Sequence, residues 1–372
     1  MHKLQTIITM SAIALASCTK ESTPQYLLIG SYASTDEEGI KVYTFDEETG
    51  SFSYVSGMTG ISNPSFVYPS ADGNFVYAVG EDVAPDTPTA NSIKFDKVSG
   101  TLTLLNTQPN PGDAPCNIIT SPDGRWAYTS NYFGGNIDEY AIMSDGTLGP
   151  ARSIEFEGSS VDTIRQTHPY LHAVNFTPDG EYLLANDLGT DRIHIFPAKG
   201  PLDVSKMKDL QILGGVGPRH LCFSPTANVA YLLGELSGDI ITIGYEENPC
   251  CGGCHYQMIQ VTKADTLNGG GSADIHVSPD GKFVYASHRL KGDGISIFKI
   301  NPTDGTIERV GYQNTGIHPR NFAITSNGKF ILVACRDSNV VQIFSRDAET
   351  GLLTDTGNAI ELSKPVCVQF IK

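Results

Sequence analysis

Basic and acidic side chains recur at two fixed positions of a hairpin that the sequence repeats from residue 64 to the end of the chain. The first position, at the start of the first strand of each hairpin, holds in chain order Ser65, Cys116, His172, Arg219, Ala273, Arg320 and Val366. The second position, at the end of the second strand, holds Asn131, Asp187, Glu235 and His288, with Arg289 next to the last of these. Such a set could hydrolyse an ester, because a carboxylate or an imidazole can activate water while guanidinium groups stabilise the oxyanion.

The two positions share one face of the hairpin, since in an antiparallel pair the start of one strand meets the end of the other. If the hairpins form a ring, one mouth of its channel is lined at a solvated rim by His172, Arg219, Arg320, Glu235, Asp187, Asn131 and Arg289. Polar side chains at strand ends are commonly structural. A function is favoured here because three of four consecutive repeats carry His or Arg at the first position. We expect the other candidate histidines to pack against this site or support it, namely His168, His220, His276 and His318.

The element that must position these residues is a repeated unit of about fifty residues. Its core is an apolar run, a turn and a second apolar run, and the turns are Asp72-Gly73, Asp123-Gly124, Asp179-Gly180, Asp280-Gly281 and Asn327-Gly328, with a degenerate copy at 226–228. We expect both central residues of such a tight turn to have positive φ. A third half-buried strand and a fourth strand follow each hairpin, and four strands per repeat predict a propeller blade.

The two ends of the chain together supply one further blade. Residues 26–54 contain the later strands of a blade but lack its first strand, while residues 364–370 match a first strand. Pairing of the two ends would close the ring and remove exposed sheet edges. The sequence therefore predicts an all-β, seven-bladed β-propeller that forms a single domain over residues 25–372.

The charge balance limits the possible partners. The chain has 25 basic and 41 acidic residues, a net charge of -16. Such a surface repels nucleic acid and anionic membranes, so we expect no nucleic-acid partner. The sequence also contains no nucleotide-binding loop, zincin helix or G-x-S-x-G nucleophile motif.

The first 18 residues have the pattern of an export signal. A short apolar run ends in Leu15, Ala16, Ser17 and Cys18, which is similar to a bacterial lipobox. On this interpretation residues 1–18 are a signal peptide ending at a lipidated Cys18, and residues 19–24 are a tether. The alternative is an ordinary secretory signal with an incidental cysteine. We expect an exported protein whose only membrane contact is the lipid at Cys18.

The remaining cysteines divide into two groups. Four lie in or beside apolar runs and are expected to be small packing residues, namely Cys116, Cys222, Cys335 and Cys367. Three others, Cys250, Cys251 and Cys254, stand with His255 in one short segment that could bind a soft metal or form a local disulfide. No second ligand pair at metal-site spacing accompanies them in the sequence, so we favour the disulfide and expect no metal.

The whole of residues 25–372 resembles the seven-bladed propeller lactonases, which include 6-phosphogluconolactonase of the propeller type and the fungal carboxymuconate lactonizing enzyme. The resemblance rests on segments 131–135, 171–173, 187–192, 217–220, 234–237, 278–281 with 287–289, and 318–322. It implies catalytic roles for His172, Arg219, Glu235 and Arg289. The chain departs from the family in having His288 where Asn is common, and in the cysteine-rich segment.

Together these features predict a lactonase that opens a sugar lactone, phosphorylated or not, without a cofactor and as a monomer. Glu235 or His172 would be the general base, and Arg219 would polarise the carbonyl. Arg320, with Asn131 and Asp187, would bind substrate. The family's phosphogluconolactone is cytosolic, whereas this chain is expected to be exported. The alternatives are a lactonizing cycloisomerase and a non-catalytic propeller that binds an anionic glycan or a protein.

Overall fold

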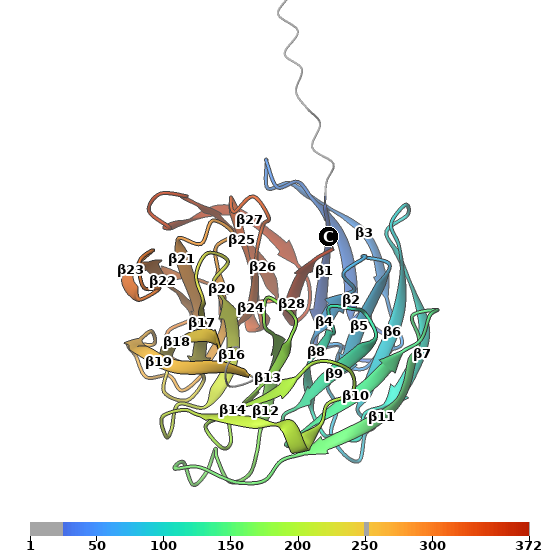
Figure 1. The fold of residues 1–372 in the computed structure, drawn as a ribbon. Helices are drawn as coiled ribbons and strands as arrows, with labels where there is room; N and C mark the ends of the chain where they lie inside the picture. Colours follow the sequence, from blue (N-terminus) through green and yellow to red (C-terminus); the bar gives the residue numbers. More distant parts are fainter. Residues whose placement is uncertain (1–24, 249–252, 372) are drawn as a thin grey trace, which may run out of the picture.

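The computed structural model describes residues 25–248 and 253–371, which are almost entirely β-strand. Seven four-stranded antiparallel sheets surround a central channel like the blades of a propeller (Figure 1). The prediction of a seven-bladed, all-β propeller is therefore confirmed. No helix in the described part of the chain is long and apolar enough to cross a membrane.

Each blade runs from an innermost strand at the channel to an outermost strand at the periphery. In that order the blades are: blade 1, β28 (Pro365–Phe370), β1 (Gln25–Ser31), β2 (Ile40–Phe45) and β3 (Phe52–Met58); blade 2, β4 (Val67–Pro69), β5 (Phe75–Gly80), β6 (Thr89–Asp96) and β7 (Thr101–Pro109); blade 3, β8 (Pro115–Thr120), β9 (Trp126–Asn131), β10 (Asn136–Ile142) and β11 (Leu148–Glu155); blade 4, β12 (Leu171–Phe176), β13 (Tyr182–Asp187), β14 (Arg192–Pro197) and β15 (Lys208–Gln211). The remaining three are: blade 5, β16 (Pro218–Phe223), β17 (Val229–Gly234), β18 (Asp239–Asn248) and β19 (Gly253–Lys263); blade 6, β20 (Ser272–Val277), β21 (Phe283–His288), β22 (Gly294–Ile300) and β23 (Ile307–Asn314); blade 7, β24 (Pro319–Ile324), β25 (Phe330–Cys335), β26 (Val340–Arg346) and β27 (Leu353–Glu361). Two short 3₁₀ helices are η1 (Val204–Lys206) and η2 (Arg336–Ser338).

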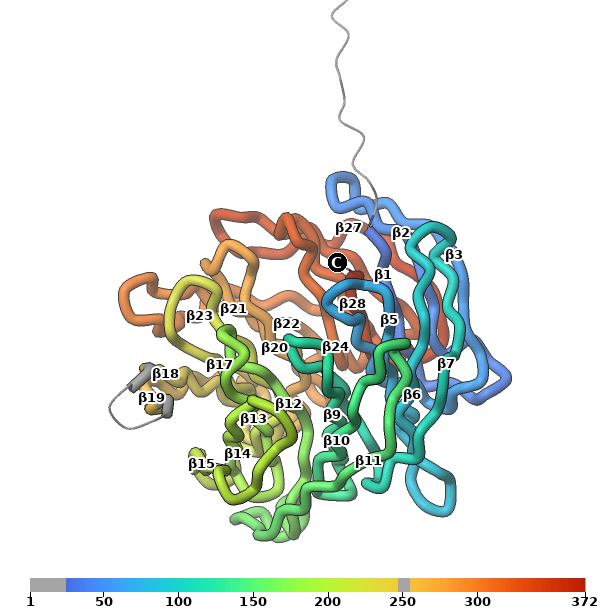
Figure 2. Tube along the Cα trace, turned by 45° about the vertical axis from the view of Figure 1, so that its right-hand side comes forward, coloured from blue at the N-terminus to red at the C-terminus, as the bar shows by residue number. Residues whose placement is uncertain are grey.

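The predicted closure of the ring is confirmed. The C-terminal strand β28 pairs antiparallel with β1, with Leu27 opposite Phe370 and Ile29 opposite Val368. Both views place the red β28 beside the blue β1 (Figures 1 and 2). The two ends of the chain thus build blade 1 jointly, and β1 is paired on both of its edges, with β28 and with β2.

The repeated turns differ from the expectation in their backbone. The glycine of each turn has positive φ, as at Gly73 (63°), but the preceding Asp or Asn does not. Its side chain instead accepts a hydrogen bond from a hydroxyl two residues earlier, as from Ser70 Oγ to Asp72 Oδ1 at 2.6 Å. This local bond holds the aspartate in a conformation with negative φ. The prediction of positive φ at both central residues is therefore wrong.

Buried tyrosines on the second strand connect neighbouring blades. Tyr231 donates its hydroxyl to the carbonyl of Gly305 in the next blade at 2.8 Å, and Tyr285 makes the same bond to Gly351. The apolar clusters likewise join neighbouring blades, as where β17 of blade 5 packs on β21 and β22 of blade 6. The four packing cysteines are free thiols, as predicted, and all are buried except the half-buried Cys222.

Several predictions fall outside the described residues. The signal peptide 1–18 with its Cys18, and the tether 19–24, belong to the undescribed N-terminal segment. The side chains of Cys250, Cys251 and Cys254 are also outside the described part of the chain. The lipid anchor and the local disulfide therefore stay predictions.

Candidate active site

A β-bulge at the start of the inner strand places one side chain at the channel mouth in five of the seven described blades. In blade 5, Pro218 pairs with Gly234 and His220 with Leu233, so Arg219 is an extra residue between two ladder pairs. The same slip leaves one residue extra in four other blades, namely Cys116, His172, Arg320 and Val366. A bulge re-aims the side chain of its extra residue. The repeated prolines and the pattern of basic residues thus mark a real structural position.

At the end of the second strand, the residue predicted for blade 5 is wrong by one position. The ladder places Gly234, and not Glu235, at the position shared by Asn131, Asp187 and His288. Glu235 is equivalent to Arg289 instead. The error arises because the turn of blade 5 has no glycine. Ala227 occupies the position that glycine has in the other turns, whereas the count of seven residues to Glu235 starts from Asn228. Since neighbouring residues of a strand face opposite ways, one residue decides whether a side chain reaches the channel mouth.

Asn131 and Asp187 accordingly face away from the mouth, which corrects the prediction that they line it. Both are fully buried. Asn131 bonds to Asn136 and Asp138 of blade 3 and to Asn110 in the loop that leads into this blade. Asp187 accepts hydrogen bonds from the backbone of Tyr170 and Gly189 and from the hydroxyl of Thr190. These contacts hold the loops of blades 3 and 4, and they leave the substrate-binding role of both residues without support in the structure.

Glu235 lies among three arginines at the mouth. Its Oε2 accepts a short hydrogen bond from Arg219 and lies 3.6 Å from Nη2 of Arg289, while its Oε1 accepts a bond of 2.7 Å from Arg165. Backbone carbonyls anchor two of the guanidinium groups, because Nε of Arg219 donates to Ala273 O and Nε of Arg289 to Gly271 O, both at 2.7 Å. The arginines are therefore fixed in place independently of any substrate.

The positive charges of these arginines control the protonation state of Glu235. Burial by itself would raise the pKa of the carboxyl group, but Arg219, Arg289 and Arg165 outweigh burial and lower the pKa to about 2. Glu235 is therefore a carboxylate at neutral pH and a weak base as long as all three cations remain beside it.

His172 stands against the same carboxylate. Its Nε2 lies 3.8 Å from Glu235 Oε2, and its ring makes edge contacts with the rings of Tyr132 and His220. Burial, reinforced by the charge of Arg219, lowers the pKa of His172 well below its ordinary 6.5. The imidazole is therefore neutral at physiological pH and can accept a proton.

The opposite wall of the mouth carries Arg320. Its Nη2 lies 3.6 Å from Glu81 Oε2, and its guanidinium group covers the ring of Tyr32 at 5.6 Å. Tyr32 in turn donates its hydroxyl to Glu81 Oε1 at 2.9 Å. Burial would lower the pKa of Arg320, but Tyr32 and Glu81, with a smaller contribution from Glu235, hold it above its ordinary value.

The structure thus brings together His172, Arg219, Glu235, Arg289 and Arg320, and it adds residues that the sequence analysis missed. Three of them follow the second strand at the position of Glu235 and Arg289, namely Tyr32, Glu81 and Tyr132. All three would have been identified if the mouth position had been placed one residue further along each second strand. Arg165 lies in the loop between β11 and β12, where no periodic signal exists. His318, expected only as a supporting residue, accepts a bond of 3.2 Å from Nη1 of Arg289 at its Nε2.

The cluster is buried, which corrects the expectation of a solvated rim. The side chains of Arg219, Arg289 and Glu235 are 3%, 6% and 8% exposed, whereas that of Arg165 is 39% exposed. Ion pairs in such a site are strong because little water screens them. In the described part of the chain no three His, Cys, Asp or Glu side chains are grouped as metal ligands.

Comparisons with known proteins agree with this architecture. A family model described as "Lactonase, 7-bladed beta-propeller" matches residues 26–370. The 6-phosphogluconolactonase of Bacillus subtilis is 31% identical over 92% of this chain and 97% of its own, and that of Formosa agariphila is 34% identical over 88% and 94%.

Two solved structures extend the similarity. A Bacteroides fragilis protein described as a candidate 6-phosphogluconolactonase is 46% identical with a TM-score of 0.88, over 95% of this chain and 99% of its own. The periplasmic gluconolactonase of Pseudomonas aeruginosa is 28% identical with a TM-score of 0.85, over 94% and 99%.

Proposed function

The chain belongs to the seven-bladed β-propeller lactonase family, and from this premise we propose that it hydrolyses a gluconolactone-type sugar lactone to the open acid at the mouth of its channel. Its relatives from Bacillus subtilis and Formosa agariphila are named 6-phosphogluconolactonases. The observation that carries the proposal is the buried Glu235 carboxylate, which lies among fixed guanidinium groups and beside a neutral imidazole.

Arg219 and Arg289 would stabilise the oxyanion. When water adds to the lactone carbonyl, negative charge develops on the carbonyl oxygen. Two guanidinium groups held in place by backbone carbonyls can meet that charge without reorganisation. Both already converge on one carboxylate oxygen of Glu235, which shows that the pair can serve a single anionic oxygen atom.

His172 would be the general base. Its neutral imidazole takes a proton from the attacking water and returns it to the ring oxygen as the ester bond breaks, so the net reaction adds one water. Glu235 is less suited to this step because both of its oxygens already accept hydrogen bonds from arginines, Oε2 from Arg219 and Oε1 from Arg165. Its negative charge would instead stabilise the imidazolium that His172 forms in transit, 3.8 Å away.

Arg165 and Arg320 would bind the polar end of the substrate. Arg165 is the most exposed guanidinium of the cluster, and Arg320 lies on the opposite wall. An anionic group on the lactone could engage either through paired hydrogen bonds. Glu81 beside Arg320 provides a carboxylate that can accept hydrogen bonds from sugar hydroxyls.

We also propose that the protein is exported, lipidated at Cys18 and monomeric. The lipobox-like ending of residues 1–18 supports export, and the similar Pseudomonas aeruginosa protein is named a periplasmic gluconolactonase. An exported enzyme would meet unphosphorylated gluconolactone more readily than its phosphate ester. Replacing Cys18 with Ser should move the protein out of the membrane fraction, and a wild type found in the cytoplasm would contradict the proposal.

The test of function is hydrolysis of glucono-1,5-lactone and its 6-phosphate by the purified full chain, measured above the spontaneous rate. We expect opening of at least one of them, and a loss of about 10²–10³ in kcat for Arg219→Ala. His172→Ala should lose about 10²–10⁴. A wild type that opens no lactone would leave the mouth as a binding site for an anionic ligand.

A further inference from the structure

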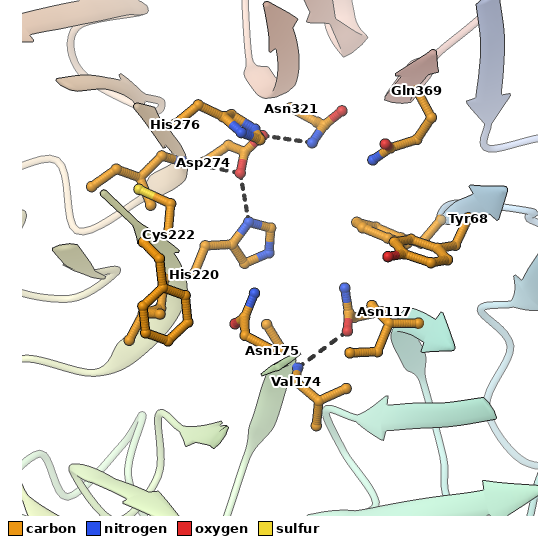
Figure 3. Close-up of a pocket in the computed structure, with 16 residues that line it drawn as sticks. Tyr68, Asn117, Val174, Asn175, His220, Cys222, Asp274, His276, Asn321 and Gln369 are labelled. Carbon is orange, nitrogen blue, oxygen red and sulfur yellow. Dashed lines mark hydrogen bonds and ion pairs between the residues drawn. The ribbon is translucent and has the colours of Figure 1, made fainter. Parts of the chain in front are cut away.

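A cavity lies in the channel beyond the mouth, toward the repeated turns. Its volume is about 300 Å³. The inner strands of all seven blades line it, and its polar and aromatic lining includes Tyr68, Asn117, Asn175, His220, Asp274 and Gln369 (Figure 3). None of the buried mouth residues, from His172 to Arg320, lines this cavity. The cavity therefore adjoins the candidate active site along the channel, where the ring of His220 contacts that of His172, but it has a lining of its own.

Asp274 organises one wall of this cavity. Its Oδ1 accepts a bond of 2.7 Å from Nδ1 of His220, and its Oδ2 accepts bonds of 2.9 Å from His276 and 2.6 Å from Asn321. The backbone of Ile275 and that of Phe322 also donate to it. The carboxylate is thus fully engaged by the protein, and it fixes His220 with the other ring nitrogen toward the open space (Figure 3).

The charge of the lining excludes ionic ligands. None of the described residues that line the cavity is Lys or Arg, so an anion would find no guanidinium or ammonium group to bind. Asp274 is already bonded by two histidines, and a cation would have to displace them. The pKa of His276 is raised, because Asp274 outweighs the effect of burial, so this pair balances its own charge.

Amide groups occupy the rest of the polar lining. Asn117, Asn175 and Gln369 direct their amides toward the open centre (Figure 3). Val174 N fixes the oxygen of Asn117, but Oδ1 of Asn175 is buried and has no hydrogen-bond partner among the described residues. A buried polar atom without a partner is unfavourable, and a ligand that lets the amide rotate and bond would remove that cost. The ring of Tyr68 adds an apolar surface.

We propose that this cavity binds a neutral polyhydroxylated molecule of monosaccharide size, at a site distinct from the lactonase mouth. Amides and an imidazole nitrogen can donate to and accept from hydroxyl groups, and an aromatic ring packs against the C–H face of a sugar. The volume is at the lower end of the range for small-molecule sites, on the order of 300–1,000 Å³.

Isothermal titration of the full chain with D-glucitol and D-glucose tests this site. Both polyols should bind in the millimolar range without inhibiting lactone hydrolysis. Asn175→Leu keeps the volume and removes the amide, and it should weaken binding by about tenfold or more while lactone hydrolysis is unchanged. If that variant does not fold, Gln369→Leu replaces it with the same expectation.

Arg320→Ala is the matched control, because it alters the mouth and leaves the cavity intact. Polyol binding should be unchanged in this variant. Binding that Arg320→Ala abolishes and Asn175→Leu preserves would place the polyol in the mouth and overturn the proposal. Absence of binding by both polyols to the wild type would overturn it as well, whether or not the chain hydrolyses lactones.

Discussion

Arg165 donates a hydrogen bond of 2.7 Å to Glu235, although the two residues are 70 positions apart in the chain. The loop between blades 3 and 4 thereby reaches a residue of blade 5. Arg165 also donates to the hydroxyl of Tyr132 at 3.2 Å. Because Arg165 is the most exposed cation around Glu235, an incoming anionic substrate would meet it first and could draw it away from the carboxylate.

Arg165→Ala should move the acidic limb of the kcat/KM profile toward neutral pH. Removing a neighbouring cation raises the pKa of Glu235 from about 2 toward its ordinary 4.5. A shift of about one pH unit is expected for the loss of one close charge. Arg165→Lys, which keeps the charge, should retain the wild-type limb, and so should Arg125→Ala at an exposed turn. An identical profile in Arg165→Ala would contradict a role of Arg165 at Glu235.

Glu235→Gln should destabilise the fold as well as reduce turnover. The substitution leaves Arg219 and Arg289 buried without their anion, and breaking a buried ion pair typically costs about 3–5 kcal/mol. Urea unfolding measures this difference. Glu308→Gln on an exposed strand position should stay within about 0.5 kcal/mol. Equal midpoints for Glu235→Gln and the wild type would show that the arginines are solvated in solution.

Folding stability should fall as the pH drops below about 4.5. The pKa of Glu235 is lower in the folded protein than its ordinary 4.5, so the folded state favours the carboxylate. Its contribution is complete above the unfolded pKa and is lost as the pH falls from 4.5 through about 2. Glu235→Gln should flatten the plot of unfolding free energy against pH in this window. A slope identical to that of the wild type would contradict the expectation.

Much of the ring and part of the site follow from the sequence. The apolar runs and turns identify the blades, and they locate His172, Arg219 and Arg320 because each occupies the same bulge of its blade. A turn whose sequence departs from the Asp-Gly pattern can give the wrong register for the strand that follows it. Blade 5 has Ala227 at the glycine position, so a register error of one residue groups Glu235 with Asn131 and Asp187. Glu235 lies at the mouth, whereas the true position of the other two does not reach it.

Other features of the site leave no trace in a periodic pattern. Arg165 reaches Glu235 through a loop, and loop contacts do not repeat from blade to blade. The burial of Arg219 and Glu235 depends on how closely seven inner strands approach each other, which the spacing of residues along one strand does not determine. The bonds of Asp274 to His220 and Asn321 likewise arise only when blades 5 and 7 are placed beside blade 6.

Deletion of residues 364–372 should prevent cooperative folding. Without β28, the strand β1 loses its inner partner and the apolar core between blades 1 and 7 is opened. A chain in which residues 364–371 precede residue 25 through a short linker restores this pairing, because β28 and β1 are antiparallel neighbours. The rearranged chain should fold and the deleted one should not. Cooperative melting of the deleted chain at the wild-type temperature would contradict the importance of closure.

Arg320→Ala should raise KM for 6-phosphogluconolactone more than for glucono-1,5-lactone. Arg320 lies across the mouth from Arg219, with its guanidinium group over the ring of Tyr32 and near Glu81, and the pair Glu81 and Tyr32 remains bonded when Arg320 is removed. A charged hydrogen bond contributes about 1.5–3 kcal/mol, so the loss should be at least about tenfold in KM for a substrate that uses this cation. Turnover should change little, since Arg320 does not contact Glu235 through any bond described for the mouth. The two lactones compared under identical conditions provide the measurement, and Arg125→Ala is again the surface control. Equal effects on both lactones would mean that Arg320 supports the wall of the mouth and does not select for charge.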